Sequence, residues 1–246
     1  MNFLFHFGRY TLFLGKVFAR PQKRKLFWDS TFREMVTLGL DSLPIVAIIS
    51  VFIGAVATIQ TASNIDSGLI PLSTIGFATR ESMLLEFSPT IIALILVGKV
   101  GSSISSELGT MRVSEQIDAM EIMGLNPANF LVLPKVIGLM IINPFIISLS
   151  IFLGVVGGYL ATVSTGVITV SEYESGITLD FYPFDYVYAM IKTVVFAFII
   201  TSVPAYFGYF VEGGSVKVGK ASTIAVVYSS IVILILNYII TQLLLL

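Results

Sequence analysis

The sequence lacks the residues on which many catalytic and metal sites depend. Its 246 residues include no cysteine and a single histidine, His6. The absence of cysteine excludes disulfide bonds, cysteine-ligated zinc and a thiol nucleophile. No Ser/His/Asp triad, HExxH motif, pair of catalytic aspartates or Walker motif can be assembled from the other residues. We therefore expect a protein that is not an enzyme and that has no metal or cofactor of its own.

Charged residues are also scarce. They make up 12% of the chain, about half of their share in a soluble domain, and the net charge is −1. Such a chain has no overall basic field, so we do not expect nucleic acid as a partner. The N-terminus lacks a basic region followed by an uninterrupted apolar run and a small-residue cleavage site, so we expect no cleaved signal peptide.

Apolar residues, in contrast, are abundant, at 56% of the chain with a mean hydropathy of +0.94. About 20 apolar residues in a helix cross the roughly 30 Å hydrocarbon layer of a bilayer. Five apolar stretches predict an all-α polytopic membrane protein with a single domain, residues 1–246, in which residues 1–34 precede the five-span part of residues 35–246. The expected spans are residues 43–59, 83–98, 136–163, 187–203 and 223–246.

Residues 1–19 predict an amphipathic helix that lies in the membrane interface. The apolar residues at helical spacing are Phe3, Phe7, Tyr10, Leu14 and Val17, and the bases on the opposite side are Arg9, Lys16 and Arg20. Such a helix dips its apolar face into the acyl boundary and turns its cations toward anionic lipid. His6 is then expected at headgroup level. The alternative is a short helix that packs only on protein.

The segments between spans differ in charge on the two sides of the membrane. Pro21 is expected to end the first helix, and the bases that follow place the N-terminus in the cytoplasm: Lys23, Arg24, Lys25 and Arg33. Residues 164–185 hold four acids and no base, so this acidic loop belongs outside. Residues 61–79 are expected as an outer loop or re-entrant connection, and residues 212–222 as a glycine-rich cytoplasmic turn. The C-terminus is then periplasmic.

The third span contains two features that affect its packing. The pair Asn143-Pro144 predicts a kink. Gly154, Gly157 and Gly158 form a face of small residues that permits a second helix to approach closely. We therefore expect this face to contact another helix and not lipid, with ordinary packing within the chain as the simplest form of that contact.

Two ionisable residues fall within predicted spans. Residues 90–98 are too short to cross a bilayer alone, so the second span must begin near residue 83 and include Glu86, unless the helix starts later and leaves Glu86 at the interface. Lys192 lies about two turns inside the fourth span, where a charge costs about 2.5–3.5 kcal/mol unless it is paired. Glu86 or an outer acid is its candidate partner. These two residues leave open an ion- or proton-coupled secondary carrier.

The longest charged run between spans, residues 105–127, predicts a separate short helix. Ser114 is a plausible N-cap, Gly124 a plausible C′ residue and Asn126-Pro127 a stop, so the helix is expected at residues 114–123. Its apolar stripe is Val113, Ile117, Met120 and Gly124, and its acidic side holds Ser114, Glu115, Asp118 and Glu121. An acid near the C-terminal end of a helix is unfavourable without a cation nearby. The pattern indicates a docking partner, with a solvated charged loop as the alternative.

This run, ELGTMRVSEQIDAMEIMGLNP, resembles the signature of MlaE-type permeases, the membrane subunits of lipid-transporting ABC systems associated with MCE proteins. The likeness continues in EFSP at residues 86–89, GKVG at 98–101, IKTVVFA at 191–197 and GGSVKVGKASTIAVV at 213–227. The resemblance implies a coupling helix between the second and third spans. It also implies transport of phospholipid, or a similar lipid, between the bacterial inner membrane and an MCE-protein carrier.

The family further implies several partners and a division of labour among them. A separate ABC ATPase subunit would hydrolyse ATP with Mg, a second copy of the chain would complete a homodimer around a lipid cavity, and an MCE-domain protein would dock outside. The residues implied in ATPase coupling are Glu107, Arg112, Glu115, Gln116, Asp118 and Glu121, and those implied in the lipid cavity are Glu86, Pro89, Lys99, Lys192 and Asn237. Leu85 and Asn237 depart from the family, in which arginine and aspartate are common at these positions.

Overall fold

The computed structural model describes residues 2–19, 24–65 and 70–245. Helices make up nearly all of these ranges, and no strand occurs within them. Five helical segments are long and apolar enough to cross a membrane, which confirms the predicted all-α, five-span architecture. Their cores lie within the apolar stretches of the sequence, but each helix extends beyond them because helical hydrogen bonding continues into the flanking polar residues.

The first two membrane segments are each built from several helical pieces in one continuous run. Residues 24–64 comprise α2 (Arg24–Glu34), the π-helix η1 (Met35–Gly39), the 3₁₀-helix η2 (Leu40–Ser42) and α3 (Leu43–Asn64). Residues 73–113 comprise α4 (Ser73–Ser82), the π-helix η3 (Met83–Ile91), α5 (Ile92–Leu96), the π-helix η4 (Val97–Gly101) and α6 (Ser102–Val113). The second segment therefore begins ten residues before Met83, and most of the expected outer loop at residues 61–79 is helical.

The other three membrane helices are single elements: α8 (Pro127–Thr165), α10 (Pro183–Tyr209) and α11 (Ser215–Leu245). Two boundaries were predicted wrongly. α10 continues through Pro204 to Tyr209, and α11 already begins inside the expected glycine-rich turn. α8 also runs without interruption through Asn143 and Pro144, where the sequence predicts a kink. Asn143 Nδ2 donates a hydrogen bond to the carbonyl oxygen of Thr193, 3.2 Å away, and so links α8 to α10.

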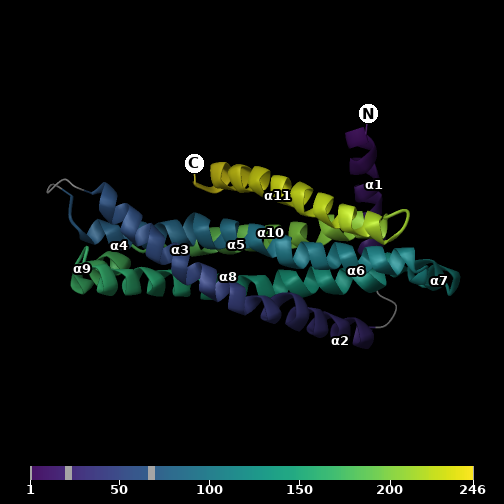
Figure 1. The fold of residues 1–246 in the computed structure, drawn as a ribbon, viewed down its shortest axis with the longest axis horizontal. Coiled ribbons are helices and arrows are strands. Elements are labelled where there is room, and N and C mark those ends of the chain that lie inside the picture. Colours follow the sequence, from purple (N-terminus) through teal and green to yellow (C-terminus); the bar gives the residue numbers. More distant parts are fainter. Residues whose placement is uncertain (1, 20–23, 66–69, 246) are drawn as a thin grey trace.

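The long helices run along one axis, and the short elements lie at its two ends (Figure 1). One end carries α7 (Gln116–Ile122) together with the start of α2 and the connection from α10 to α11. The opposite end carries α4 and α9 (Val170–Thr178). The charged run of residues 105–127 and the acidic segment of residues 164–185 therefore lie at opposite ends of the bundle. We refer to these as the α7 end and the α9 end.

α1 (Asn2–Val17) lies across the bundle axis at the α7 end (Figure 1), the direction expected of an interfacial helix. Phe13 and Val17 are buried against the bundle, and Tyr10 donates or accepts a hydrogen bond with Ser202 at 2.7 Å. Burial raises the pKa of the Tyr10 hydroxyl. Phe7, which was expected on the apolar face, is 61% exposed. The helix thus packs on protein with one face and leaves another uncovered.

The small-residue face of α8 packs against α3, as the three glycines predict. A Cβ atom on Gly157 would lie 2.0 Å from the carbonyl oxygen of Val51, so the two backbones are in direct contact. Two helix turns earlier along α8, Ser50 Oγ donates to Ser150 Oγ at 2.8 Å. The expected contact is therefore made within the chain. Close backbone approach compensates for the weak hydrophobic driving force between helices in lipid.

The segment at residues 164–185 is not simply a loop, because it contains α9. The helix begins with a capping box in which the backbone N–H of Glu172 donates to Thr169 Oγ1 at 3.3 Å and that of Thr169 donates to Glu172 Oε2 at 3.0 Å. Arg80 of α4 is 5% exposed and donates to the carbonyl oxygens of Ile177 and Leu179, both at 2.7 Å. These bonds fix α9 on α4.

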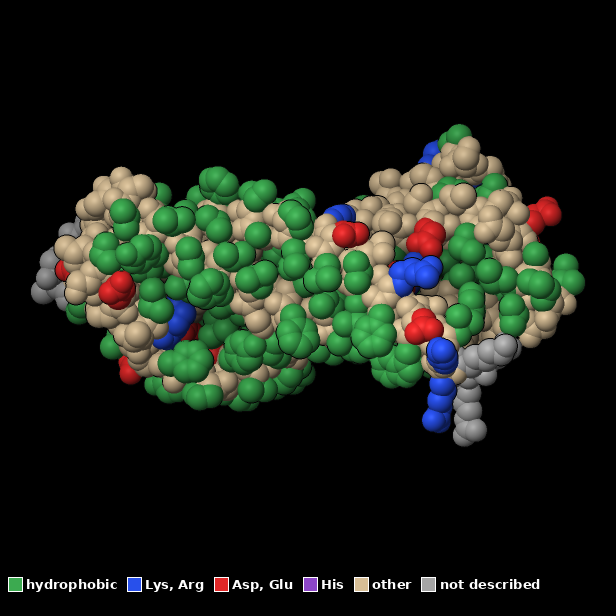
Figure 2. Space-filling view, turned by 90° about the horizontal axis from the view of Figure 1, so that it is seen from below, with side chains coloured by type: hydrophobic (Ala, Val, Ile, Leu, Met, Phe, Trp, Pro, Cys, Tyr) green, Lys and Arg blue, Asp and Glu red, His purple; other side chains and the backbone are tan. Residues whose placement is uncertain are grey.

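The surface matches this arrangement. Figure 2 shows hydrophobic side chains over most of one face, with acids and bases toward its two ends. The least buried of the membrane helices is α11, in which only 17% of the most apolar stretch is buried by the rest of the protein. Its exposed apolar side chains include Val227, Ile231, Leu234, Ile235 and Tyr238. Lipid or a second polypeptide must cover this face in a membrane.

Candidate functional site

A cluster of polar side chains lies inside the bundle where η3, α10 and α11 meet. At its centre, Lys192 Nζ is 2.8 Å from Glu86 Oε1. The Lys192 side chain is fully buried, whereas that of Glu86 is 39% exposed. Of the alternatives left open by the sequence, the structure therefore has Glu86 within a membrane helix and Glu86, not an outer acid, as the partner of Lys192. Pairing offsets much of the cost of placing either charge in a hydrophobic environment.

Lys192 is held by neutral acceptors in addition to Glu86. Its Nζ donates to the carbonyl oxygen of Leu85 at 3.0 Å and to the hydroxyl of Tyr188 at 2.8 Å. Pro89 lies in the same π-helix, is buried and has no backbone N–H to donate, so it offers no hydrogen bond to a ligand. With its three donors used, the ammonium is an internal group that a ligand cannot reach.

Glu86 receives further hydrogen bonds from α11 and from its own helix. Asn237 Nδ2 donates to Glu86 Oε2 at 3.0 Å, and Thr90 Oγ1 lies 3.2 Å from the same oxygen. Thr241 Oγ1 lies 3.3 Å from Glu86 Oε1. The carboxylate is thus oriented from three sides and keeps part of its surface open. A half-exposed, oriented acceptor of this kind can bind the donor groups or the cation of a lipid headgroup.

Asn237 and Leu85, the two departures from the common pattern, are neutral in this cluster. An aspartate at position 237 would bring a second carboxylate against Glu86, and an arginine at position 85 would supply a second cation. Their replacement by Asn237 and Leu85 removes one charge of each sign. The cluster therefore keeps its balance, with one acid and one base.

η3 explains why these groups face inward together. A π-helix has a wider turn than an α-helix, and such turns occur frequently at functional sites. η3 places Leu84, Ser88, Pro89 and Thr90 in buried positions while Glu86 stays half-buried. The cluster does not include Lys99, which lies 13 residues later along the same run, about 20 Å by helical rise. Lys99 Nζ instead donates to the carbonyl oxygen of Asp41.

The second candidate site is the short helix at the α7 end, where one predicted boundary is wrong. α6 ends at Val113, and α7 spans Gln116–Ile122. Ser114 is not an N-cap: its Oγ donates to the carbonyl oxygen of Thr110 at 2.8 Å. Glu115 joins the two helices with a left-handed backbone, at φ 59°. The predicted end is confirmed, because Gly124 has φ 76° and the amide of Leu125 donates to the carbonyl oxygen of Met120.

Most of the acids at this end have partners within the chain. Asp118 pairs with Arg112, and Glu121 Oε1 accepts a hydrogen bond from the Tyr209 hydroxyl at 3.0 Å. Lys135 Nζ lies 2.8 Å from Glu107 and 2.7 Å from Glu34, which joins α8 to α6 and α2. The bonds of Asp118 and Glu121 hold α7 on the bundle. The sequence pattern had indicated a cation on another protein as the counterpart of Glu121.

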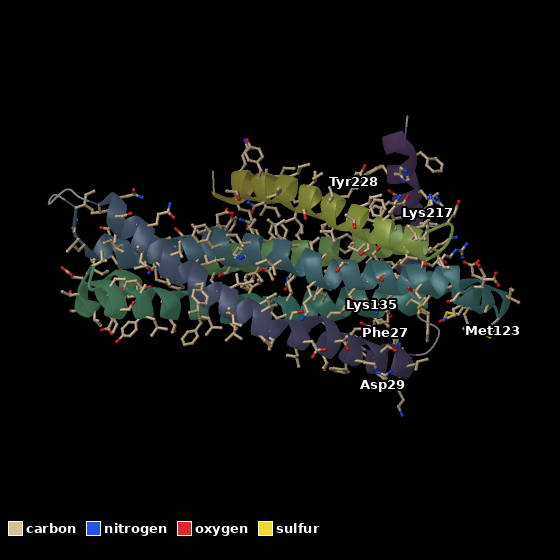
Figure 3. The ribbon with its side chains drawn as sticks, viewed as in Figure 1. Phe27, Asp29, Met123, Lys135, Lys217 and Tyr228 are labelled. Carbon is tan, nitrogen blue, oxygen red and sulfur yellow. The ribbon has the colours of Figure 1, made fainter. Side chains whose placement is uncertain are left out.

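The tip of α7 is uncovered and apolar. Ile122 is 87% exposed and Met123 is 68% exposed, and Met123 lies at the far end of the molecule (Figure 3). Glu115 and Gln116 are exposed beside them, while Ile117 is buried beneath the helix. Large apolar side chains rarely remain open on a folded surface without a partner. This tip therefore has the character of a docking surface.

Comparisons with known proteins bear on both sites. The family model described as Permease MlaE matches residues 31–243. A probable ABC transporter permease protein of Rickettsia prowazekii is 36% identical over 236 residues, 96% of this chain and 91% of the relative. The intermembrane phospholipid transport system permease protein MlaE of Haemophilus influenzae is 30% identical over 94% of this chain and 88% of its own. The Arabidopsis thaliana chloroplastic protein TRIGALACTOSYLDIACYLGLYCEROL 1 is 31% identical over 93% of this chain and 65% of its own.

The chain belongs to the MlaE permease family. It is an ABC transporter permease with several membrane-spanning helices. The family match covers both candidate sites, the cluster around Glu86 and the helix α7.

Sequence reasoning did not find several members of these sites. Tyr188, Thr90 and Thr241 in the polar cluster are ordinary helix residues in the sequence, although Tyr188 lies one turn before Lys192. Ile122 and Met123 were missed because the apolar stripe was counted from Val113 through Ile117, Met120 and Gly124 and does not include them. The position of these apolar residues at the end of a short amphipathic helix was a usable signal.

Proposed function

We propose that this permease moves phospholipid, or a similar lipid, out of or into the bacterial inner membrane, driven by a separate ABC ATPase subunit that binds ATP and Mg. The relative from Haemophilus influenzae is named a permease of an intermembrane phospholipid transport system. A lipid carrier on the outer side, of the MCE-domain type, exchanges lipid with the permease. In this arrangement the N-terminus and α7 are cytoplasmic and the C-terminus is periplasmic.

The observation that carries the proposal is the attachment of α7 to the helix that bears Glu86. Residues 73–113 form one continuous helical run, and two residues separate its end from α7. The Arg112–Asp118 pair and the Tyr209–Glu121 hydrogen bond bind α7 to this run and to α10. An ATPase that binds the tip of α7 and changes conformation therefore moves the helix that positions Glu86. Arg112, Asp118 and Glu121 act by fixing α7, and Glu107 acts by joining α6 to α8 through Lys135. Glu115 and Gln116 contact the ATPase.

Two copies of the permease enclose the lipid. α11 and α3 have extended apolar faces that a second copy covers, and Glu86, Lys192 and Asn237 lie between η3, α10 and α11. The acyl chains contact the apolar faces, and the headgroup reaches the open side of Glu86. An ion- or proton-coupled carrier would need a titratable site that a solute can enter, and the tight pairing of fully buried Lys192 favours a structural charge.

Reconstitution with the partner ATPase tests the proposal. The double variant Ile122→Ser, Met123→Ser should release the ATPase and abolish ATP-dependent movement of labelled phospholipid in proteoliposomes. Val216→Ser is the matched control, because Val216 is an apolar residue 74% exposed near the connection from α10 to α11. Full transport by the double variant would contradict coupling through α7. Transport driven by an ion gradient without ATP would contradict the proposal and support an ion- or proton-coupled carrier instead.

A further inference from the structure

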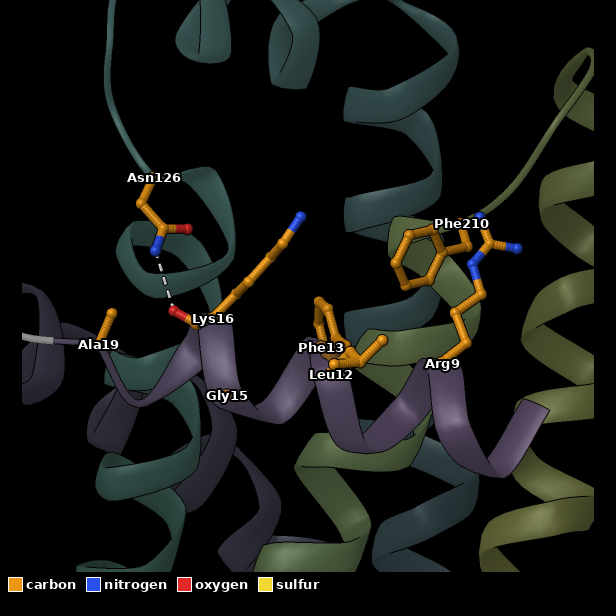
Figure 4. A pocket seen from close by; sticks show the side chains of 8 residues that line it. All are labelled: Arg9, Leu12, Phe13, Gly15, Lys16, Ala19, Asn126 and Phe210. Carbon is orange, nitrogen blue, oxygen red and sulfur yellow. Dashed lines mark hydrogen bonds between the residues drawn. The ribbon is translucent and has the colours of Figure 1, made fainter. Parts of the chain in front are cut away.

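A pocket at the α7 end is separate from both sites described above. It has a volume of about 600 Å³ and lies above α1, between the turn that precedes α8 and the end of α10 (Figure 4). Its walls are mainly apolar and include Leu12, Phe13, Gly15 and Phe210. Two cationic side chains, Arg9 and Lys16, stand on its rim. No acidic residue lines it among the described residues.

The two cations have no anionic partner within the described part of the chain. Neither Arg9 nor Lys16 forms an ion pair or a side-chain hydrogen bond there, in contrast to the paired bases Arg80, Lys135 and Lys192. The Arg9 guanidinium lies 3.9 Å from the centre of the Phe210 ring, which holds the group by its face. Its N–H edge remains available to an anion, as does the Lys16 ammonium.

The pocket is held in shape by bonds to the backbone of α1. Asn126 Nδ2 donates to the carbonyl oxygen of Lys16 at 2.9 Å (Figure 4). Asn129 Nδ2 donates to the carbonyl oxygens of Val17 and Ala19 at 2.7 and 2.6 Å. The end of α1 is therefore fastened to the start of α8, and Asn126 belongs to the turn that follows α7. The backbone that carries the two cations is therefore held in place before any ligand binds.

The placement of α1 indicates which anion reaches this pocket. α1 lies across the bundle axis, and Phe7 on this helix and Phe18 just after it are exposed. An interfacial helix with its apolar face in the acyl boundary carries its cationic face at the level of the lipid headgroups. A ligand with one anionic group for the cations and apolar chains for Leu12 and Phe13 matches the lining. We propose that this pocket binds the phosphate group of an anionic phospholipid from the leaflet in which α1 lies.

The site is distinct from the transport route and does not depend on the ATPase. Lys16 follows Arg9 by seven positions, about 10 Å along the helix axis, so a phosphate between them is within reach of both long side chains. Bound lipid would attach α1 to the membrane surface. Through the Asn126 bond to α1 it would also stabilise the turn that connects α7 to α8. The permease would then respond to the anionic lipid content of its own membrane.

Two glycines of α1 provide a matched pair of variants. A Cβ atom on Gly8 or on Gly15 would meet nothing within 4 Å, so a side chain at either position starts in open space. Only Gly15 lines the pocket. Gly15→Leu should fill the pocket and displace lipid, whereas Gly8→Leu should leave binding unchanged. The double variant Arg9→Gln, Lys16→Gln should weaken binding about thirtyfold, the factor expected for two cations that face an anionic lipid.

The probe is dioctanoyl phosphatidylglycerol, added to the full-length permease in neutral detergent and detected as a bound adduct by native mass spectrometry. Dioctanoyl phosphatidylcholine and inorganic phosphate are the comparison ligands. We expect phosphatidylglycerol to bind best and Gly15→Leu to abolish that preference. Equal binding of phosphatidylcholine or of inorganic phosphate, or equal loss in both glycine variants, would overturn the proposal. It would also fail if the pocket variants kept lipid and lost only the ATPase subunit, because the pocket would then be a protein contact.

Discussion

A Cβ atom on Gly54 of α3 would lie 1.8 Å from the carbonyl oxygen of Gly154 of α8. The two glycines thus allow backbone-to-backbone contact at the crossing of the first and third membrane helices. Neither the oxygen nor the helix that carries it can move aside without separating the pair.

Gly54→Ala should therefore destabilise the permease. Overpacking typically costs about 1–3 kcal/mol, and a clash with backbone places this variant at the upper end. The measurement is the midpoint of thermal unfolding in detergent. Gly219→Ala in α11 is the control, because a Cβ there meets nothing within 4 Å and alanine favours the helix. Equal midpoints for the two variants would show that the helices are not in contact at Gly54.

The ion pair in the polar cluster predicts an unequal effect of its two neutral variants. Glu86→Gln leaves the fully buried Lys192 ammonium without a counter-charge, at a cost of about 3–5 kcal/mol. Lys192→Met leaves a carboxylate that is 39% exposed and still receives a hydrogen bond from Asn237, so it should cost less. The double variant should recover part of the stability.

A double-mutant cycle on unfolding free energies measures this coupling. Glu212→Gln, an exposed acid of the turn between α10 and α11, serves as the control for loss of a negative charge. A smaller loss for Glu86→Gln than for Lys192→Met would contradict the burial seen for Lys192. Additive single effects would show that the pair is not formed.

The stability of the α7 end should likewise depend on a buried lysine, Lys135. Its side chain is 4% exposed and lies between Glu34 and Glu107. Lys135→Met would leave two carboxylates facing each other and should cost about 3 kcal/mol, the lower end for a buried pair because Glu107 is half-exposed. Hydrogen exchange of α2 and α6 should rise together. Unchanged protection in α2 would show that Lys135 does not join these helices.

α9 should lose stability in acid. Hydrogen bonds from the side chain and backbone of Thr169 lower the pKa of the Glu172 carboxyl. Because the pKa of Glu172 is lower in the folded state, its ionised carboxylate stabilises α9 fully above the unfolded-state pKa of about 4.3. This stabilisation is lost as the pH falls through the folded-state pKa. Amide protection of α9, corrected for the intrinsic effect of pH, should fall over that range. Glu172→Gln should remove the pH dependence, and its persistence would assign the effect to another group.

The membrane spans could be predicted from the sequence because hydropathy acts over a single continuous stretch. Residues 187–203 are apolar apart from Lys192 and, with their flanking residues, are long enough to cross the hydrocarbon layer, whatever they contact. Helix ends were less well predicted. α10 runs on past Pro204 to Tyr209. The end of α7 was predicted correctly because Gly124 is a local signal: glycine readily takes the positive φ that ends a helix.

For the candidate sites as well, some features could be predicted from the sequence and others could not. The charged run at residues 105–127 stands out by composition, and Glu86 and Lys192 stand out as charges in apolar surroundings. That Asp118 and Glu121 are satisfied within the chain could not be predicted. Their partners lie on α6 and on the distant α10, and a carboxylate in the sequence carries no sign of which base or hydroxyl will reach it.

The sequence by itself determined that this chain is a five-span helical membrane protein of the MlaE type, because apolar length and charge placement are local properties. Tertiary structure alone decided which polar groups meet. Lys192 and Glu86 are 106 residues apart along the chain, and the packing of α10 and α11 on η3 brings them to 2.8 Å. The pocket beside Arg9 and Lys16 likewise exists only because α1 crosses the bundle, and that crossing depends on contacts with helices far along the sequence.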